Sequence, residues 1–460
     1  MTTGLRRFTK VQAAKTLMGL VPHLSVDNLV RATAFAERLT RVERDRAAIR
    51  AIREHFERRD PALMMAREVY ERLSPNCRKK LVSNLFVNAF LIGTDMREID
   101  IPAAEGFRPP MFLVISPTMR CNLRCPGCYA GEYEQHQGLS TELVDRIIRE
   151  AKAMGTYFIT MSGGEIFTRP DMFDIWKEHD DVFFQLYTNG TLIDDRVAKR
   201  LEECGNVAPM ISLEGFRELT DERRGPGAFD AVMAAMDALR EAGVMFGTSF
   251  TETRENVEQI ASDEILDLLV RKGALVAWYF QYIPIGREPH VDLMPTPEQR
   301  DWLRRRILEV REEKPIFIGD FWNDGYYVEG CIAAGREYLH INANGDVEPC
   351  VFCHFAVDNI RDKSLKEVLN SGFMKSIRAR QPYRENMLTP CMLIDEPTVL
   401  REAVVKHGAH PTHPGAETLV TELKEQIDEY ARQYRAIADD VWEKEYVPKF
   451  ARKIKSARYA

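Results

Sequence analysis

Three cysteines lie within eight residues of this chain, Cys121, Cys125 and Cys128, in the spacing C-x3-C-x2-C. Thiolates this close together are typical of ligands that wrap one compact inorganic group, and soft thiolates favour iron–sulfur or zinc. A structural zinc site needs four protein ligands, whereas this stretch supplies three. The spacing therefore predicts a [4Fe–4S] cluster with one iron open to a small molecule. A zinc knuckle or three buried structural cysteines are the alternatives.

The segments around the cysteines narrow the interpretation. An apolar run of strand type, residues 112–116, precedes them, and Ser162-Gly163-Gly164-Glu165 follows a second such run. C-x3-C-x2-C after a first strand, with G-G-E after the second, resembles the radical S-adenosylmethionine (SAM) enzymes. The resemblance implies that the open iron binds SAM and that reductive cleavage of the C5′–S bond gives a 5′-deoxyadenosyl radical. That radical takes a hydrogen from an unactivated C–H bond, while the protein supplies position and a dry cavity.

Strand and helix patterns alternate through residues 107–314, which predicts an α/β fold. Alternation of this kind implies a parallel sheet with right-handed crossovers. Six units match the partial (β/α)6 TIM-like barrel of the resembled family, whose functional residues collect at the carboxyl ends of the strands. The strand candidates are residues 112–116, 157–161, 183–187, 209–213, 245–251 and 277–283.

Two motifs follow the second and third predicted strands. The resemblance assigns the loop of Gly163, Gly164 and Glu165 to the amino group of the methionine moiety of SAM, and glycines let the backbone approach a ligand closely. Asn189, in the Thr-Asn-Gly stretch after the third strand, is a further candidate for cofactor binding. Each stretch alone is ordinary turn chemistry, so the prediction depends on their order along the sheet.

Polar groups after the fourth strand complete the predicted SAM site. Ser212 and Glu214 stand in an S-x-E-G stretch, which resembles the family segment whose polar groups reach the ribose. Arg224 resembles the arginine near the SAM carboxylate, which suits a guanidinium because it can bond with both oxygens. The family usually has an aromatic residue just before the third cysteine. That place is Gly127 here, so Tyr129 is the candidate for the adenine contact.

A second set of cysteines lies in residues 315–400. Cys331 and Cys350 flank a predicted β-hairpin with an Asn-Gly turn at Gly345, and C-x13-G-x4-C resembles the opening of the SPASM/twitch extension of this family. The further C-x2-C-x5-C-x3-C run of a full SPASM domain is absent, which favours a shorter twitch-like domain. The resemblance implies one auxiliary [4Fe–4S] cluster on Cys331, Cys350 and Cys391. The fourth ligand is either Cys353 or absent, which would leave one iron open to the substrate. Zinc on four thiolates is the alternative.

Charge is distributed unevenly along the chain. The net charge is −7, yet residues 1–110 carry 20 Lys and Arg against 13 Asp and Glu. The overall charge gives no reason to expect nucleic acid, and a basic front end suggests contact with an anionic surface. No apolar signal segment and no run of roughly 20 apolar residues is present. The sequence therefore predicts a cytoplasmic protein, with residues 1–106 as the candidate for peripheral contact with the inner face of the membrane.

The outer segments predict helices. Residues 1–106 form a predicted helical domain, in which residues 11–21 and 81–93 are apolar with basic residues beside them. Such segments suit helices that lie in a membrane interface, and docking on the catalytic domain is the alternative. Residues 401–460 are predicted as a linker and helices.

The predicted substrate is a lipid or another apolar chain, because the front end is basic and amphipathic. A peptide is the second candidate, since many relatives with such an extension modify peptides. A non-catalytic iron–sulfur or zinc scaffold is the third. The resemblance also implies an electron donor such as flavodoxin or ferredoxin.

Overall fold

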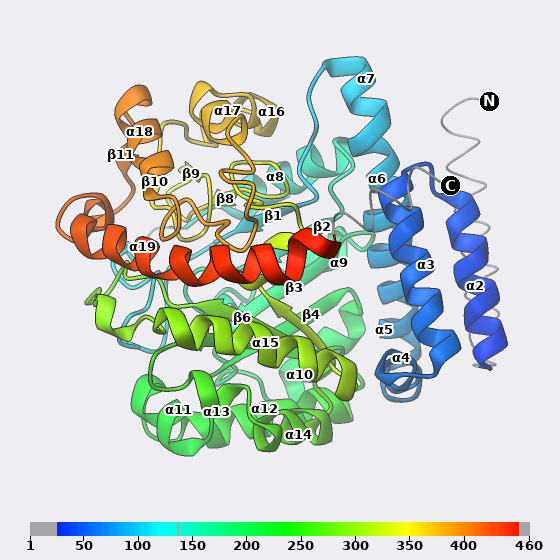
Figure 1. The fold of residues 1–460 in the computed structure, drawn as a ribbon. Coiled ribbons are helices and arrows are strands. Elements are labelled where there is room, and N and C mark those ends of the chain that lie inside the picture. Colours follow the sequence, from blue (N-terminus) through cyan, green and yellow to red (C-terminus); the bar gives the residue numbers. More distant parts are fainter. Residues whose placement is uncertain (1–24, 137, 450–460) are drawn as a thin grey trace.

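A nine-stranded sheet organises the computed structural model, which describes residues 25–136 and 138–449 (Figure 1). The strand order is β7-β6-β5-β4-β3-β2-β1-β8-β9, and neighbours from β7 through β8 are parallel. All six predicted strands are present, which confirms the α/β partial barrel. The parallel strands are β1 (Phe112–Ile115), β2 (Phe158–Met161), β3 (Phe183–Thr188), β4 (Val207–Leu213), β5 (Gly247–Glu252), β6 (Val276–Gln281) and β7 (Phe317–Asp320).

Helices connect the strands of the barrel and cover its outer surface. In α8, for example, Val144, Ile147, Ile148 and Ala151 are buried, which is the apolar face that the 3.6-residue period indicates. The Ser140 hydroxyl caps the start of this helix by accepting from the Leu143 N–H at 3.2 Å. The connecting helices are α8 (Thr141–Ala153), η3 (Ile166–Thr168), α9 (Met172–Glu178), α10 (Asp195–Cys204), α11 (Arg217–Arg224), α12 (Ala228–Glu241), α13 (Val257–Ile260), α14 (Asp263–Lys272), η4 (Val291–Leu293) and α15 (Pro297–Glu313).

The segment before β1 is helical, as the sequence predicts, and stands beside the barrel (Figure 1). Two of its helices begin at prolines, Pro61 and Pro75, whose missing N–H groups need no partner at that position. The side chains of Asp60 and Ser74 cap these two starts. The helices are α2 (Val26–Leu39), α3 (Glu43–Arg58), α4 (Pro61–Arg72), α5 (Pro75–Lys80), η1 (Leu81–Ile92), α6 (Gly93–Asp95), η2 (Met96–Asp100) and α7 (Ile101–Glu105).

The apolar segment at residues 81–93 docks on the barrel rather than standing free. Helix η1 buries one face, and the Asn84 side-chain amide donates to the Asp180 carbonyl oxygen at 2.8 Å. Phe86 and Phe90 remain on the outer face, 52% and 38% exposed, with ring centroids 6.3 Å apart. Of the two interpretations of this segment, a membrane-interface helix or a helix docked on the catalytic domain, the structure shows the docked helix. The other apolar segment, residues 11–21, lies outside the described residues.

The chain after β7 forms a small unit on the free side of β1. The predicted hairpin is present, and its first strand, β8, extends the barrel sheet by pairing parallel to β1. Gly345 has φ +87° at the turn, a conformation in which a Cβ is strained. The elements are η5 (Asn323–Tyr326), β8 (His340–Ile341), β9 (Val347–Glu348), β10 (Phe355–Ala356), α16 (Leu365–Leu369), α17 (Gly372–Arg378), α18 (Pro397–His407), β11 (His410–Pro411), η6 (Ala416–Val420), α19 (Lys424–Val441) and η7 (Trp442–Tyr446).

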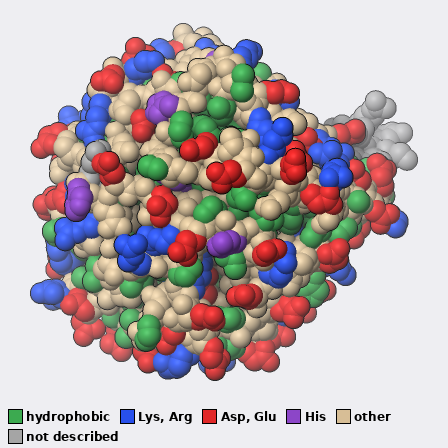
Figure 2. All heavy atoms as spheres, turned by 90° about the vertical axis from the view of Figure 1, so that its left-hand side faces the viewer, with side chains coloured by type: hydrophobic (Ala, Val, Ile, Leu, Met, Phe, Trp, Pro, Cys, Tyr) green, Lys and Arg blue, Asp and Glu red, His purple; other side chains and the backbone are tan. Residues whose placement is uncertain are grey.

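The long helix α19 lies across the barrel and the hairpin unit (Figure 1). It packs on α15, and its Tyr430 hydroxyl accepts a hydrogen bond from Gln281 Nε2 at 2.6 Å. On the face that Figure 2 shows, the described acidic and basic side chains are interspersed rather than gathered by sign. Within residues 25–136 and 138–449, no helix combines the length and apolarity that crossing a bilayer requires.

Candidate functional site

The three clustered cysteines lie in the loop after β1, and all three line the main cavity of the protein. Burial raises the pKa of the Cys121 thiol, and the nearby Glu165 carboxylate raises that pKa further. The Leu123 backbone N–H donates to Cys121 Sγ at 3.4 Å. Three soft sulfur donors that face one cavity fit a metal cluster with an open coordination position.

Arg287, which the sequence prediction missed, holds this loop from the far side of the barrel. Its guanidinium donates to the Cys125 carbonyl oxygen at 3.2 Å, and its backbone N–H donates to the Cys128 carbonyl oxygen at 3.0 Å. A Cβ at the preceding Gly286 would lie 2.3 Å from that same Cys128 oxygen. The Gly-Arg pair after β6 was the signal that could have identified this contact, because glycine there permits the close approach.

The glycine pair after β2 packs directly against the cysteine loop. A Cβ at Gly163 would lie 2.4 Å from the Thr118 carbonyl oxygen, and one at Gly164 would lie 2.3 Å from the Arg120 carbonyl oxygen. Both glycines line the cavity. Close backbone packing therefore requires glycine at both positions and brings their peptide groups to the cavity wall beside the thiols.

Glu165 lies behind that wall and holds the neighbouring strand end. Its side chain is fully buried and accepts from the Thr188 hydroxyl and the Asn189 backbone N–H, both at 2.8 Å. Burial raises the pKa of this carboxyl, although these hydrogen bonds and the more distant Arg224 oppose the shift. Within this motif the two glycines therefore line the cavity, whereas the glutamate holds the backbone of Asn189.

Three other predicted residues line the cavity near the thiols. The Asn189 side-chain amide donates to Cys121 Sγ at 3.8 Å, and the Ser212 hydroxyl lies 3.4 Å from the Ser249 hydroxyl. The Tyr129 hydroxyl lies 2.5 Å from the Ser162 hydroxyl, and burial raises the pKa of Tyr129 to about 12, so the phenol stays protonated at neutral pH. The cavity wall beside the cysteines is thus polar but uncharged at these positions.

Glu214 and two arginines form a buried charge group at the end of β4. Glu214 is 1% exposed, and Arg224 Nε donates to its carboxylate at 2.9 Å. Arg223 forms a second ion pair with this carboxylate at 2.8 Å. Both arginines line the cavity. Two guanidinium groups and one carboxylate leave one net positive charge at the wall, which suits a carboxylate ligand.

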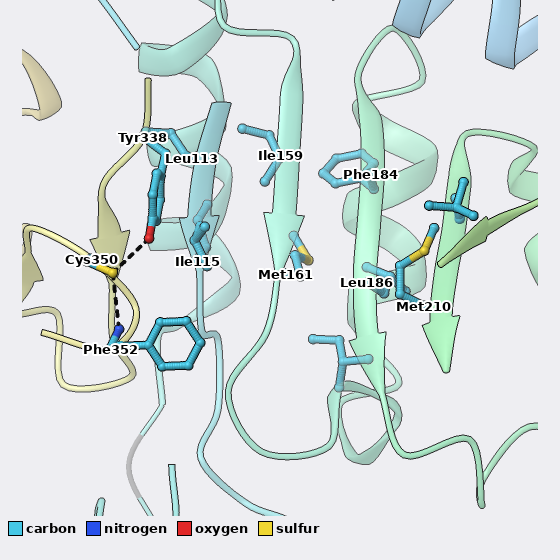
Figure 3. Packing of buried hydrophobic residues seen from close by; sticks show 14 of the residues in the cluster. Leu113, Ile115, Ile159, Met161, Phe184, Leu186, Met210, Tyr338, Cys350 and Phe352 are labelled. Carbon is cyan, nitrogen blue, oxygen red and sulfur yellow. Dashed lines mark hydrogen bonds between the residues drawn. The ribbon is translucent and has the colours of Figure 1, made fainter. Parts of the chain in front are cut away.

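The four later cysteines gather around the hairpin unit. Tyr338 OH donates to Cys350 Sγ at 2.8 Å, and the Phe352 backbone N–H lies 3.5 Å from the same sulfur (Figure 3). The backbones of Cys350 and Cys353 pair as an isolated antiparallel β-bridge, and both thiols are free. Burial raises the pKa of the Cys391 thiol, and the charges of Cys331 and Cys350 raise it further. Burial and the charges of Cys350 and Glu348 raise the pKa of the Cys353 thiol. The four cysteines belong to one small unit, and soft sulfur donors of this kind suit a thiolate-bound group.

A buried ion pair positions the last of these cysteines. Asp395 Oδ2 accepts from the Cys391 backbone N–H at 2.9 Å, and both of its oxygens accept from the Arg300 guanidinium, at 2.6 and 3.1 Å. Both side chains are fully buried, and the ring of Tyr434 lies 3.7 Å from the guanidinium carbon. Helices α15 and α19 thereby fix the loop that carries Cys391.

The main cavity has a volume of about 780 Å³ and extends along the inside of the barrel. At the carboxyl ends of the strands it meets the cysteine loop, and beyond that its wall is rich in aromatic side chains. Phe352, beside Cys350, packs edge-on against Tyr129 at a centroid distance of 5.5 Å. This ring contact joins the residue after Cys128 to the hairpin unit beside the cavity.

Two family models match this chain. Residues 115–263 match the radical SAM superfamily, and residues 331–392 match SPASM, an iron–sulfur cluster-binding domain. The Fe-coproporphyrin III synthase of Methanosarcina barkeri is 35% identical over 308 residues, which are 59% of this chain and 77% of that protein. The mycofactocin maturase MftC of Mycolicibacterium smegmatis is 32% identical over 293 residues, 59% of this chain and 71% of that protein.

Solved structures share the fold at lower sequence identity. The structure of SuiB from Streptococcus suis bound to SAM has a TM-score of 0.54 at 19% identity, and covers 65% of this chain and 76% of its own. SuiB bound to the precursor peptide SuiA has a TM-score of 0.53 at 19% identity and covers 65% of this chain and 75% of its own.

Proposed function

The chain belongs to the radical SAM superfamily and carries an iron–sulfur-binding SPASM domain, and from this premise we propose that it abstracts hydrogen from a C–H bond of an apolar chain, a lipid, by means of a 5′-deoxyadenosyl radical. It is an enzyme whose cofactors are a [4Fe–4S] cluster, SAM and auxiliary iron–sulfur clusters. The cavity that joins the three-cysteine loop to an aromatic interior supports the choice of an apolar substrate.

Each residue of the carboxyl-end wall has a role in this proposal. Cys121, Cys125 and Cys128 hold the cluster, which when reduced supplies the electron that cleaves SAM. The backbone at Gly163 and Gly164 receives the amino group of SAM. Arg224, whose guanidinium already binds one carboxylate, receives the SAM carboxylate.

The remaining wall residues orient the rest of SAM and exclude water. In the proposal Ser212, with Glu214 behind it, serves the ribose, Asn189 lies beside Cys121, and Tyr129 contacts the adenine. Phe352 and Tyr129 cover the site from the hairpin side, and their contact keeps water from a reactive carbon radical.

The hairpin unit holds the second group in this proposal. Cys331, Cys350, Cys353 and Cys391 bind one auxiliary cluster, and Tyr338 donates a hydrogen bond to Cys350. An electron donor such as flavodoxin or ferredoxin supplies reducing power from outside the chain. In this proposal the auxiliary cluster exchanges an electron with the reacting substrate, and the contact of Tyr129 with Phe352, a residue near Cys350 and Cys353, supports that role.

A peptide substrate is the second candidate, and it rests on the comparisons. SuiB, which shares the fold, has been solved with a precursor peptide, and MftC is named a maturase. In this candidate the same radical chemistry acts on one residue of a polypeptide.

The experiment is 5′-deoxyadenosine formation by reduced, anaerobically reconstituted protein. Three arms contain SAM alone, SAM with total lipid extract, and SAM with cytosolic peptide extract. We expect stimulation by the lipid arm. Stimulation by the peptide arm alone would transfer the function to the second candidate, and no deoxyadenosine from fully loaded protein would overturn the radical mechanism.

A further inference from the structure

The cavity does not end behind the SAM site but continues to the amino ends of the strands. Phe112, Phe158 and Phe317 are the first residues of β1, β2 and β7, and all three line it. Met65 of α4 lines it as well. Strands of four to six residues span roughly 13–20 Å at about 3.3 Å per residue. The cavity therefore reaches from the cysteine loop to the helices that precede the barrel.

The lining changes character along this path. Hydroxyl and amide side chains concentrate near the carboxyl ends, where Ser212 pairs with Ser249 and Gln185 donates to the Tyr187 hydroxyl at 3.0 Å. Toward the amino ends the wall is apolar and aromatic. We call this part the amino-end channel, and its lining includes Met65, Phe112, Phe158, Trp278, Ile316 and Phe317.

Three nitrogen-bearing side chains at the outer mouth of the channel have carboxylate partners within the protein. His55 Nδ1 lies 2.5 Å from the Asp60 carboxylate, and the Arg311 guanidinium forms an ion pair with Asp324 at 2.6 Å. Lys314 Nζ lies 2.7 Å from Asp267. These three side chains already have carboxylate partners, which disfavours an anionic ligand, and Glu312 adds a further carboxylate to the lining.

An extended peptide would fit this lining poorly. Each peptide residue brings one N–H and one C=O that need partners, and burying them unpaired is unfavourable. An alkyl chain carries no such groups. The Trp278 indole occupies space that exists because position 319 is glycine, where a Cβ would lie 2.4 Å from the ring. Its buried N–H has no hydrogen-bond partner among the described residues. Apart from this single N–H, the wall of the amino-end channel suits a ligand that fills volume without hydrogen bonding.

We propose that the amino-end channel holds an uncharged alkyl chain of the substrate, and that α4 of the N-terminal helical segment forms its outer mouth. This inference rests on the proposed function, since it places one end of the chain beside the SAM site. It also gives the N-terminal helices a part in substrate selection. The lipid headgroup stays outside, near Met65 and Phe317, the latter 50% exposed.

The test uses full-length holoenzyme and the uncharged fluorescent probe N-phenyl-1-naphthylamine, displaced by n-alcohols from hexanol to dodecanol. Each buried methylene is expected to tighten binding about fourfold until the channel is full. Met65→Trp narrows the mouth, so we expect dodecanol to bind about tenfold more weakly, the equivalent of nearly two methylenes. Met64→Trp is the matched control, because Met64 directly precedes Met65 on α4, is 54% exposed and lies outside the cavity lining.

Further arms separate the remaining outcomes. An acetylated, amidated apolar hexapeptide should not displace the probe. Phe317→Ala widens the mouth, so it should allow branched 3,7-dimethyloctanol to bind. This second variant tests the channel even if Met65→Trp fails to fold. Displacement by the peptide, or equal chain-length profiles for Met65→Trp and Met64→Trp, would overturn the channel. Wild-type SAM cleavage, measured separately as 5′-deoxyadenosine without substrate, distinguishes failure of the channel from failure of the radical mechanism.

Discussion

At the scale of single residues, the nine cysteines separate by what surrounds each sulfur. Cys77 and Cys204 are 2% and 5% exposed and lie among apolar side chains of the core. Cys121 instead receives N–H groups from Leu123 and Asn189 and faces the cavity. A small buried hydrophobe needs no donors, whereas a thiolate ligand does. Spacing along the chain suggested the same division before any contact was known.

Replacement of Cys125 by alanine should abolish SAM cleavage while the fold persists. Cys125 lines the cavity and is only partly buried, so its loss removes a cluster ligand without opening the core. The measurements are 5′-deoxyadenosine formation, iron content and the electron paramagnetic resonance signal of the reduced cluster. Cys204→Ala serves as control, with activity kept and stability lower by about 1 kcal/mol. Full activity in Cys125→Ala would contradict the ligand assignment.

Glu165 and Glu214 show the limit of prediction from motifs at this scale. The sequence places each at the end of a strand, but it does not tell a ligand from a residue that positions a ligand. In the structure Glu165 holds the end of β3, and Glu214 holds Arg224. Side-chain direction depends on partners contributed by other elements, which local spacing does not contain.

Glu252 should make stability depend on pH. This last residue of β5 is fully buried, and neither carboxylate oxygen has a hydrogen-bond partner in the described part of the chain. Burial and the nearby Asp320 raise its pKa well above the usual value, although Arg300 opposes them. Above the ordinary glutamate pKa of about 4.3, the folded protein holds a proton that the unfolded chain has lost. Stability contributed by the protonated form is therefore lost as pH rises toward the folded-state pKa.

Glu252→Gln removes this dependence because an amide does not ionise. We expect the Tm of the variant minus that of the wild type to increase from pH 5.5 to pH 8.5, and the variant to gain at least about 1 kcal/mol at the upper end. Thermal unfolding by circular dichroism at closely spaced pH values measures it. A difference that is constant across the range would argue that Glu252 is ionised or paired in the folded protein.

At the scale of elements, hydrophobic periodicity predicted the long helices and six parallel strands. It missed β7 and β11 for different reasons. β7 has only four residues and contains Gly319, which lowers strand propensity but makes room for Trp278. β11 consists of His410 and Pro411, which read as linker and pair with β10 through a distant part of the chain. Such short strands depend on tertiary contacts rather than on their own pattern.

The contact between α15 and the Cys391 loop leads to a prediction about stability and metal content. Arg300→Leu leaves Asp395 buried without its cation, which should destabilise the fold by about 3–5 kcal/mol. It should also lower iron content, because Asp395 holds the Cys391 backbone. Adding Asp395→Asn removes the stranded charge and keeps an acceptor for that N–H, so the double variant should recover stability and iron. Unfolding and iron analysis measure both, and normal iron in Arg300→Leu would contradict the link.

At the scale of the whole molecule, two of the N-terminal helices contact the barrel or its cavity. Helix η1 bonds to the loop before β3, and α4 lines the cavity. The sequence predicted a helical segment with a basic excess, but charge patterning does not reveal which of its apolar residues the barrel covers. The exposed pair Phe86 and Phe90 is what remains of the apolar segment for an outside partner.

The last prediction concerns that pair and a membrane surface. We expect the full chain to bind phosphatidylglycerol vesicles more tightly than phosphatidylcholine vesicles, and to bind less as salt rises, since residues 1–110 carry an excess of cations. Phe86→Ser with Phe90→Ser should reduce partitioning about tenfold, because two aromatic side chains no longer leave water. Val405→Ser, at a position 84% exposed on α18, should leave binding unchanged.

Sedimentation with vesicles at several salt concentrations measures this binding and separates its two contributions. Loss of binding in the phenylalanine variant with an unchanged salt slope would assign the apolar contribution to η1 and the electrostatic one to the basic residues around it. Equal binding by wild type and variant would remove η1 from the interface. The channel mouth on α4 belongs to the same helical segment that is expected to meet the membrane. If the wild-type chain does not bind vesicles, the substrate lipid must therefore reach the amino-end channel from solution or from a carrier.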